Sequence, residues 1–538
     1  MNRQEYNLLS EPWILVSNLH GSAPEKISLL ELFQKAHELR GFCGECETQN
    51  ISLLRLCLAV LTTVISRYDR DGAEEPLEDM VDAMDRWADW WNAKAFPYKV
   101  IGRYLESYRD RFNLFDDEQP FYQDAETGRE LDKEYRGKPA KKTISEVAKN
   151  YLNAGKLIGD LSESGNKVRL FKSTVQTVLE PDEAARWLIN FMNTDDKSEK
   201  KPTPKNCGFL GEIGCVSVEG DNLFETLMLN LYLTDQYDFL EKPYWEIKEA
   251  IGANSVITPT GIAQYYTFQT RRLFLDVQEG KIVGFKSKAG NCVEEIPLFE
   301  PMTMWRIKGN ERKPRKHDSA VSLWRNFSLL VSDTDDNAKP NLARWLSELT
   351  DPEREALPED FRVRFRSVGI EYGSMQSSIA NVFEDSVGFS ALILNKKNDE
   401  YRNNVDRQLE VTKQYAEVYA RLVSKLFLAS GGDKGERGKN LTGKKAEAKA
   451  ELFAALDMPF RTWLMNVGTV YKTAADAGDS WWDMLTRIGR RLSEERLRNL
   501  PDAALFGRSG NSAAEAYNWF SYCTSTTERL NKEVSEKK

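Results

Sequence analysis

The sequence predicts an α+β protein with a large, irregular mixed α/β N-terminal domain followed by a C-terminal four-helix bundle. Short strand patterns and helical patterns alternate over residues 1–395, and no internal repeat is present. Four amphipathic patterns joined by polar connections then fill residues 396–538. The length of 538 residues is sufficient for both domains and at least one large core.

The N-terminal domain begins with a short strand pattern at residues 12–17. Apolar residues at helical spacing predict a helix over residues 28–42. Residues 51–68 are apolar almost all round, which predicts a buried helix. Residues 77–96 form an amphipathic pattern with three tryptophans near one face, which we expect in the core rather than stacked on bases: Trp87, Trp90 and Trp91.

Two further elements are predicted in this domain. Pro181 begins a helix whose first turn also holds Asp182 and Glu183, and proline and acidic residues are favoured there. Residues 273–277 and 281–285 are strand patterns separated by a short turn that contains glycine. This combination predicts a β-hairpin.

The C-terminal domain is predicted from helical periodicity. The four patterns cover residues 403–430, 444–467, 480–500 and 512–534. The first of them has an apolar stripe: Val405, Leu409, Tyr415, Leu422 and Leu426. Residues 430–445 are too polar for a core, and we expect them to form a connection.

Composition indicates a soluble protein of the cytoplasm. The N-terminus has no basic-then-apolar signal pattern, and no run of about 18 apolar residues predicts a membrane span. Seven scattered cysteines, an odd number without regular spacing, fit a reducing compartment.

The net charge of −9 argues against a free-standing DNA-binding protein, because phosphate binding requires Lys and Arg on one surface. Locally basic segments nevertheless occur, at residues 136–142, 197–205, 306–317 and 434–445. Each alone is typical of a solvated surface, but together they make a local nucleic-acid track plausible.

Motifs for catalysis are weak. Cys43 and Cys46 have the spacing of half a zinc site or of a redox pair, but no second pair completes a zinc site. A redox motif typically has a strand before it and a helix after it, whereas here a helix is predicted before it. We therefore expect two ordinary cysteines in a connection between helices.

Two other motifs are incomplete. Residues 438–445 have the glycine and lysine spacing of a phosphate-binding loop, but Lys445 stands where Ser or Thr is required. The pair His317-Asp318 is typical of metal-dependent phosphohydrolases, which need more histidines than the three in this chain. The sequence therefore predicts binding rather than catalysis, with neither a metal ion nor a cofactor.

A family resemblance is carried by several segments in collinear order. These are YNLLSEPWILVS at the N-terminus, SLLELFQKAHELRGF, the Thr48-Gln49 pair before a leucine-rich helix, SGNKVRLFKS before LEPDEAARWLINF, NLFETLMLNLYL and GIEYGSMQSSI. Together they resemble CasA, also called Cse1, the large subunit of the type I-E CRISPR effector Cascade. The resemblance covers most of the chain.

The resemblance implies a DNA-recognising subunit without catalytic activity. Such a subunit reads the protospacer-adjacent motif of duplex DNA, largely from the minor groove, and helps to separate the strands for guide pairing. The minor groove distinguishes base pairs poorly, which suits a loose motif. The implied partners are the backbone, small and handle-binding subunits of Cascade, the CRISPR RNA, target double-stranded DNA, and a helicase-nuclease recruited after target binding.

The resemblance also implies site residues. Gln376, among small residues of GSMQSSI, matches a glutamine wedge that props the duplex open. Met375 beside it offers an apolar wedge. A lysine on a hairpin corresponds to Lys286 or Lys288, which alternate on one strand and so share a face, and Lys288 is preferred.

Two more segments follow from the resemblance. The family has a glycine-rich loop after the AARWL helix, but this chain has a basic run there, which we expect to grip phosphates: Lys200, Lys201 and Lys205. Residues of SGNKVRLFKST match a loop that docks near the guide RNA handle and a backbone subunit: Asn166, Lys167, Arg169 and Phe171.

Two other classes of function stay open at this point. One is a nucleic-acid-processing enzyme that uses carboxylate-bound metal, since carboxylates are abundant. The other is a purely structural scaffold subunit that never touches DNA.

Overall fold

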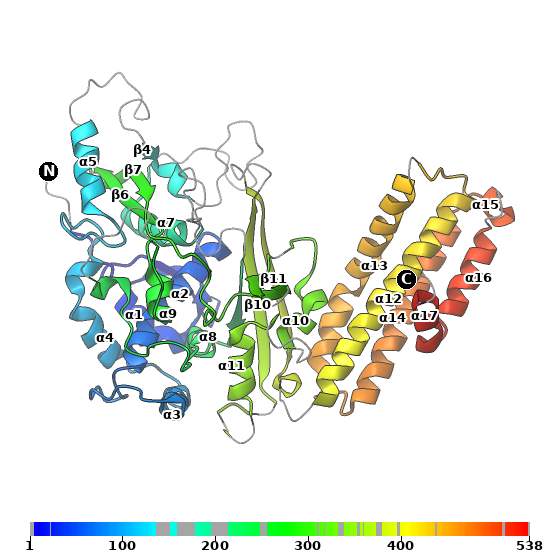
Figure 1. Cartoon of the computed structure of the whole chain (residues 1–538), viewed down its shortest axis with the longest axis horizontal. Helices are drawn as coiled ribbons and strands as arrows, with labels where there is room; N and C mark the ends of the chain where they lie inside the picture. The colour runs from blue at the N-terminus through cyan, green and yellow to red at the C-terminus, as the bar shows by residue number, and fades with distance from the viewer. Residues whose placement is uncertain are drawn as a thin grey trace. The chain divides into compact units, whose positions relative to one another are not determined.

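The fold comes from a computed structural model, shown in Figure 1. It describes residues 5–21, 23–135, 151–158, 178–194, 214–247, 256–308, 311–316, 318–331, 338–351, 354, 356–358, 360–372, 379–394, 399–435, 438–507 and 512–535. The chain divides into two compact units. The first comprises Met1–Ala320, Asn337–Leu346 and Arg364–Ser386, and the second comprises Val321–Asp336, Ser347–Val363 and Val387–Lys538.

The first unit mixes helices with small sheets. Its helices include α1 (Leu29–Lys35), α2 (Glu47–Ile65), α3 (Met80–Asn92), α4 (Tyr98–Glu106), α5 (Ala125–Tyr135), α7 (Pro181–Thr194), α8 (Leu223–Asn230) and α9 (Ile262–Thr267). Helix α1 begins at a capping box, in which Ser28 Oγ accepts from the Glu31 amide and the Glu31 carboxylate accepts from the Ser28 amide. Helix α11 (Asn341–Leu349) contributes residues to both units.

Four antiparallel sheets are formed by the described residues. Their strands are β1 (Ile14–Asn18), β2 (Glu25–Ile27), β3 (Leu39–Phe42), β4 (Tyr151–Asn153), β5 (Cys215–Glu219), β6 (Arg271–Gln278), β7 (Lys281–Ala289), β8 (Trp305–Lys308), β9 (Glu311–Pro314), β10 (Arg362–Tyr372) and β11 (Ile379–Ser390). The strand orders are β2-β1-β3, β11-β10-β5, β4-β7-β6 and β8-β9. The long strands β10 and β11 contribute residues to both units.

Helix α2 is the centre of the first core, and its residues from Thr48 to Ile65 are all buried. By length and composition alone α2 could cross a membrane, but its whole apolar stretch is buried inside the unit. Arg55 lies within it, 3.5 Å from Glu300 and over the ring of Tyr266. Burial raises the pKa of the Glu300 carboxyl, and Arg55 opposes that shift.

The second unit is mainly helical. It contains α10 (Ser328–Val331), α12 (Asp399–Ala429), α13 (Lys439–Asn466), α14 (Ala474–Arg498), α15 (Ala503–Phe506), α16 (Ala513–Cys523) and α17 (Thr527–Ser535). In Figure 1, α12 runs between α13, α14 and α16. The buried indole of Trp463 donates to Ala477 O at 2.8 Å, and that of Trp481 donates to Thr412 Oγ1 at 2.9 Å. These bonds give the indole N–H groups of two large core side chains a hydrogen-bond partner.

The predicted fold class is confirmed: strands mix with helices, and the C-terminal region is helical. The apolar stripe of α12 is buried along its length, and so are the three tryptophans of α3. The predicted β-hairpin is also confirmed, as β6–β7. Its turn residues Glu279 and Gly280 have φ values of 52° and 78°, which is typical of the tight turns that match strand twist.

Three predicted elements differ from the structure. The helix expected over residues 28–42 ends at Lys35, and Leu39 begins β3 because this segment pairs with β1. The last C-terminal helix is broken after Cys523 into α16 and α17. The polar connection is shorter than expected, because α13 already begins at Lys439.

Candidate nucleic-acid interface

Lys286 and Lys288 lie on β7, the middle strand of the sheet β4-β7-β6. Lys286 stands opposite Phe274, and Lys288 stands opposite Arg272. The two lysines do share a face, because both amines meet one carboxylate, that of Glu130 on α5. Their exposure differs greatly. The Lys286 side chain is 1% exposed, whereas that of Lys288 is 28% exposed.

Acidic residues of α5 and the turn before it neutralise this face. The Lys286 amine lies 3.7 Å from Glu130 Oε2, and Lys288 forms a close ion pair with the same oxygen. Arg272 pairs with Asp124 at 3.0 Å and with Glu126 at 2.7 Å. In this structure Lys286 is therefore enclosed, and Lys288 is the one of the two whose side chain is partly open to solvent.

The strands that flank Gln376 are described, although Gln376 itself is not. Strand β10 pairs with β5 in a register that places Arg366 opposite Ser217 and Arg364 opposite Glu219. Val363 and Phe365 alternate with these arginines and are buried. Residues 373–378, which include Met375 and Gln376, connect β10 to β11 and lie outside the described residues.

Arg366 is surrounded by three carboxylates from three elements. Its guanidinium lies 2.6 Å from Glu47 at the start of α2, 2.6 Å from Glu384 on β11 and 3.6 Å from Glu219 on β5. Burial disfavours the charged form of Arg366, but these carboxylates outweigh it and raise the pKa of the guanidinium. The neighbouring Arg364 pairs with Glu219 at 3.3 Å, its one carboxylate partner among the described residues, and its side chain is 40% exposed.

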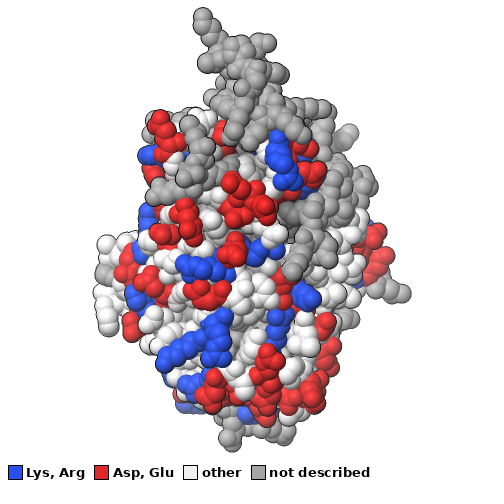
Figure 2. Space-filling model, turned by 90° about the vertical axis from the view of Figure 1, so that its left-hand side faces the viewer, with Lys and Arg blue, Asp and Glu red and all other residues white. Residues whose placement is uncertain are grey.

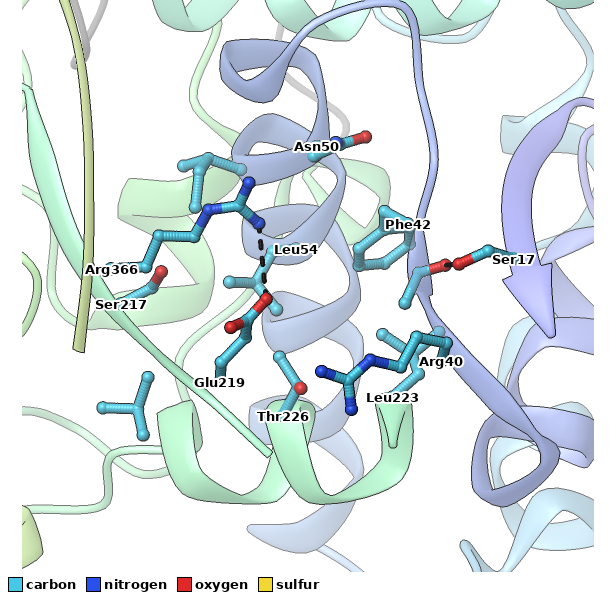
Figure 3. Close-up of a pocket in the computed structure, with 13 residues that line it drawn as sticks. Ser17, Arg40, Phe42, Asn50, Leu54, Ser217, Glu219, Leu223, Thr226 and Arg366 are labelled. Carbon is cyan, nitrogen blue, oxygen red and sulfur yellow. Dashed lines mark hydrogen bonds and ion pairs between the residues drawn. The ribbon is translucent and has the colours of Figure 1, made fainter. Parts of the chain in front are cut away.

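A small pocket lies beside Arg366, as Figure 3 shows. Residues of β3, α2, β5, α8 and β10 line it, including Arg40, Phe42, Glu219 and Thr226. Arg366 and Glu219 point toward each other across it. Among the lining residues that the structure describes, none is a histidine or a cysteine. Its lining does include a carboxylate, that of Glu219, which is paired with Arg366.

Charges of both signs alternate over the face of the molecule in Figure 2. Lys and Arg side chains lie next to Asp and Glu side chains, and neither sign forms a continuous field among the residues drawn in colour. Part of the basic segment 306–317 forms the strand pair β8–β9, in which Lys313 pairs with Glu311 at 2.7 Å. Much of the basic charge is thus already paired within the protein.

The other predicted contact residues lie outside the described part of the chain. This holds for Lys200, Lys201 and Lys205 and for Asn166, Lys167, Arg169 and Phe171. In sequence, the first group follows the end of α7 at Thr194. Helix α7 itself begins at Pro181 with Asp182 and Glu183 in its first turn, as predicted.

The expected setting of Cys43 and Cys46 was wrong. A strand, β3, precedes the pair and helix α2 follows it, with Cys46 as the residue that begins the helix. The sheet of β3 is antiparallel and no βαβ unit is present there, so the arrangement is unlike a thioredoxin-type redox site. Within the described residues, no group of three or more His, Cys, Asp or Glu side chains is placed to hold a metal ion.

The segment that resembles a phosphate-binding loop is helical. From Lys439 onward it forms the first turns of α13, and Lys444 pairs with Glu447 at 2.7 Å. A phosphate-binding loop instead presents successive backbone N–H groups around an anion, which a regular helix interior cannot do. This segment is therefore not a nucleotide site.

The fold is similar to solved structures of CRISPR-associated proteins. The fold matches the crystal structure of Thermobifida fusca Cse1 with a TM-score of 0.78, at 24% identity, over 99% of this chain and 98% of that one. It also matches a chain in a solved CRISPR RNA-guided surveillance complex with a TM-score of 0.64, at 16% identity, over 92% of this chain and 99% of that one. The architecture is therefore one found among CRISPR-associated proteins.

The sequence gives the family. A protein of Thermus thermophilus described as CRISPR-associated protein CasA/Cse1 is 27% identical over 455 residues, which are 81% of this chain and 80% of the relative. The profile of the family described as CRISPR-associated protein Cse1 matches residues 7–492. The chain belongs to the Cse1 family, and the predicted resemblance is confirmed.

The sequence patterns did not identify two acidic residues that contact α7 and β10. The CGEC motif draws attention to its cysteines, whereas Glu45 and Glu47 make the long-range contacts. The available signal was an acidic residue just before and just inside the start of a buried helix. Their partners, Arg186 and Arg366, are too distant in sequence for that signal to have identified them.

Proposed function

We propose that this chain is the non-catalytic large subunit of a type I-E Cascade complex. In that complex it recognises the protospacer-adjacent motif in duplex DNA and promotes strand opening, so that the guide RNA can pair. The observation that carries this proposal is the match of the Cse1 profile to residues 7–492. The shared fold with a chain of a surveillance complex supports it.

The proposed partners follow from that role. They are the backbone, small and handle-binding subunits, the CRISPR RNA, target DNA, and the helicase-nuclease that acts after target binding. The mixed charges and the net charge of −9 support a role inside a complex, because basic side chains such as Lys288 and Arg366 are already paired with carboxylates. The isolated chain should therefore bind DNA weakly at physiological salt.

The proposed site residues divide by role. Lys288 enters the groove, supported by its partly exposed side chain, whereas the burial of Lys286 suits a supporting position. Gln376, with Met375, acts as the wedge between bases. The basic run Lys200, Lys201 and Lys205 contacts phosphates, and the segment that contains Asn166, Lys167, Arg169 and Phe171 docks at the guide handle.

Omission of the subunit tests the proposal. The complex is assembled with and without this chain, and its binding to duplexes with and without the motif is measured at several salt concentrations. We expect motif-dependent binding and opening to require the chain. Unchanged, motif-dependent opening in its absence would contradict the proposal and leave the scaffold role.

The isolated chain tests the catalytic alternative. It is purified and incubated with labelled DNA and magnesium or manganese, and we expect the DNA to stay intact. Cleavage that copurifies with the chain would favour a carboxylate–metal enzyme.

A further inference from the structure

Residues 44–50 comprise the end of the connection between β3 and α2 and the first turn of α2, and they contact two elements that lead into proposed DNA-contacting segments. One is α7, which ends at Thr194 just before the basic run. The other is β10, which ends at Tyr372 just before the residues that include Gln376. We call residues 44–50 the junction segment.

Glu45 of the junction segment holds α7. Its carboxylate lies 3.2 Å from the Arg186 guanidinium and accepts a hydrogen bond of 3.1 Å from the Trp187 indole. The side chains of Arg186 and Trp187 are almost fully buried, so their N–H groups need acceptors within the protein, and Glu45 is one such acceptor. A second contact joins the same elements, because Asn190 donates to Thr48 Oγ1 at 3.2 Å.

Glu47 of the junction segment holds β10. Its Oε2 atom lies 2.6 Å from the Arg366 guanidinium, and Asn50 donates to the same oxygen at 3.1 Å. The side chains of Glu47 and Arg366 are 28% and 21% exposed. An ion pair this sheltered from solvent is stronger than an open surface pair.

Two backbone amides of the junction segment are bonded to side chains of α2, which holds the segment in place. The Gly44 amide donates to Asn50 Oδ1 at 2.7 Å, and the Glu45 amide donates to Gln49 Oε1 at 3.0 Å. A Cβ atom at Gly44 would lie only 2.4 Å from Gln49 Oε1 and 2.7 Å from Asn50 Oδ1. A larger residue at position 44 would require the Gln49 and Asn50 side chains to move and would disturb the two bonds that tie the connection to the first turn of α2.

We propose that the junction segment couples motif contact to strand opening, with Glu45 and Glu47 as positioning residues that act through α7 and β10. This inference rests on the proposed function. Because this segment contacts both elements, we expect a shift of α7 on motif contact to be passed to β10 through Glu45 and Glu47, which lie two residues apart at the start of α2. The arrangement explains why acidic residues stand in a subunit that works on DNA.

The test uses assembled complex and a fluorescent base beside the motif. Glu47→Gln keeps the shape of the side chain and removes its charge. We expect it to slow opening of intact duplex about fivefold, since contacts of this kind couple their partners by amounts of that order. Opening of a duplex already unpaired beside the motif should be as fast as with wild type, because a bubble removes the assisted step.

A double-mutant cycle with Gln376→Ala separates the inference from the proposed function. If Glu47 acts through the hairpin, adding Glu47→Gln to Gln376→Ala should slow opening no further. Normal opening by Gln376→Ala would refute the proposed function itself. Slow opening by Gln376→Ala, together with an additive or absent effect of Glu47→Gln, would refute only the coupling role.

Glu45→Gln tests the other contact. We expect it to weaken binding of motif-bearing duplex about threefold to fivefold, and to add nothing in a variant that lacks Lys200, Lys201 and Lys205. An additive loss would overturn this part. The control is Glu75→Gln, which removes a more exposed pair with Arg86, at 2.9 Å, that leads to neither segment. Glu75→Gln should leave the opening rate unchanged. If it slowed opening as much as Glu47→Gln does, the slowing would be attributed to general destabilisation and not to the junction segment.

Discussion

The hairpins β6–β7 and β10–β11 both carry basic residues at alternate positions, but they are neutralised differently. In β6–β7, Lys286 and Lys288 share one carboxylate, that of Glu130 on a single helix. In β10–β11, three elements each supply a carboxylate to Arg366. The first arrangement gives Lys288 a single described carboxylate partner, and the second gives Arg366 three from separate elements.

This difference indicates different roles for similar sequence patterns. A lysine with one carboxylate partner can exchange that partner for a phosphate, so β6–β7 is suited to direct contact. An arginine with three partners is held by the fork geometry of its guanidinium, so β10–β11 is suited to precise placement of what it carries. The predictions below test this contrast.

The largest effect is expected from Arg366→Ala. It leaves Glu47, Glu219 and Glu384 close together without their shared cation, so the first unit should lose about 2 kcal/mol in free energy of unfolding. Chemical denaturation followed by tryptophan fluorescence measures this loss. A change below about 0.5 kcal/mol would show that the three pairs contribute little.

Lys288→Ala should act on DNA binding rather than on folding. We expect the assembled complex to bind duplex about threefold to tenfold more weakly, with the salt-dependence slope reduced by up to about one unit. Binding titrations over a range of salt concentrations check this. Lys286→Ala is the comparison variant, and an equal or larger loss with it would contradict the assignment of Lys288.

Glu130→Gln should have a smaller effect of opposite sign. The change removes the carboxylate that competes with phosphate for Lys288, so affinity of the complex for duplex should rise about twofold to threefold. Glu126 lies on the same helix but pairs with Arg272, so Glu126→Gln serves as the control. Weaker binding by Glu130→Gln would mean that the carboxylate orients Lys288 rather than masks it.

The smallest effect is expected from Arg364→Ala. This side chain is 40% exposed and has one carboxylate partner, so its loss should change the free energy of unfolding by less than about 0.5 kcal/mol. The same denaturation experiment, compared with Arg366→Ala, measures the difference between neighbouring arginines of one strand. Equal losses would remove the contrast between them.

Local signals predicted much of the fold. The turn at Glu279 and Gly280 specified the β6–β7 hairpin, and helical periodicity specified α2, α3 and α12. The helix predicted over residues 28–42 failed because tertiary pairing overrode local pattern: Leu39 follows the apolar spacing of α1 but pairs, as part of β3, with Asn18 of β1.

The candidate site was predicted less completely. Strand alternation placed Lys286 and Lys288 on one face, but their different burial depends on the packing of α5, which no local pattern reveals. Strand β10 carries arginines at alternate positions: Arg362, Arg364 and Arg366. The carboxylates that neutralise Arg366 come from residues as distant in sequence as Glu47, so the sequence could not show that this charge is already satisfied.

The central claim is that the β10–β11 hairpin carries the residue that opens the duplex. The most direct measurement is the opening rate beside the motif, read from a fluorescent base, for wild type and Gln376→Ala in assembled complex. The account predicts near-normal initial binding and slow opening of intact duplex by the variant, with full recovery on a pre-opened duplex, because unwinding and guide pairing nearly balance. Equal opening of intact duplex by both proteins would contradict it.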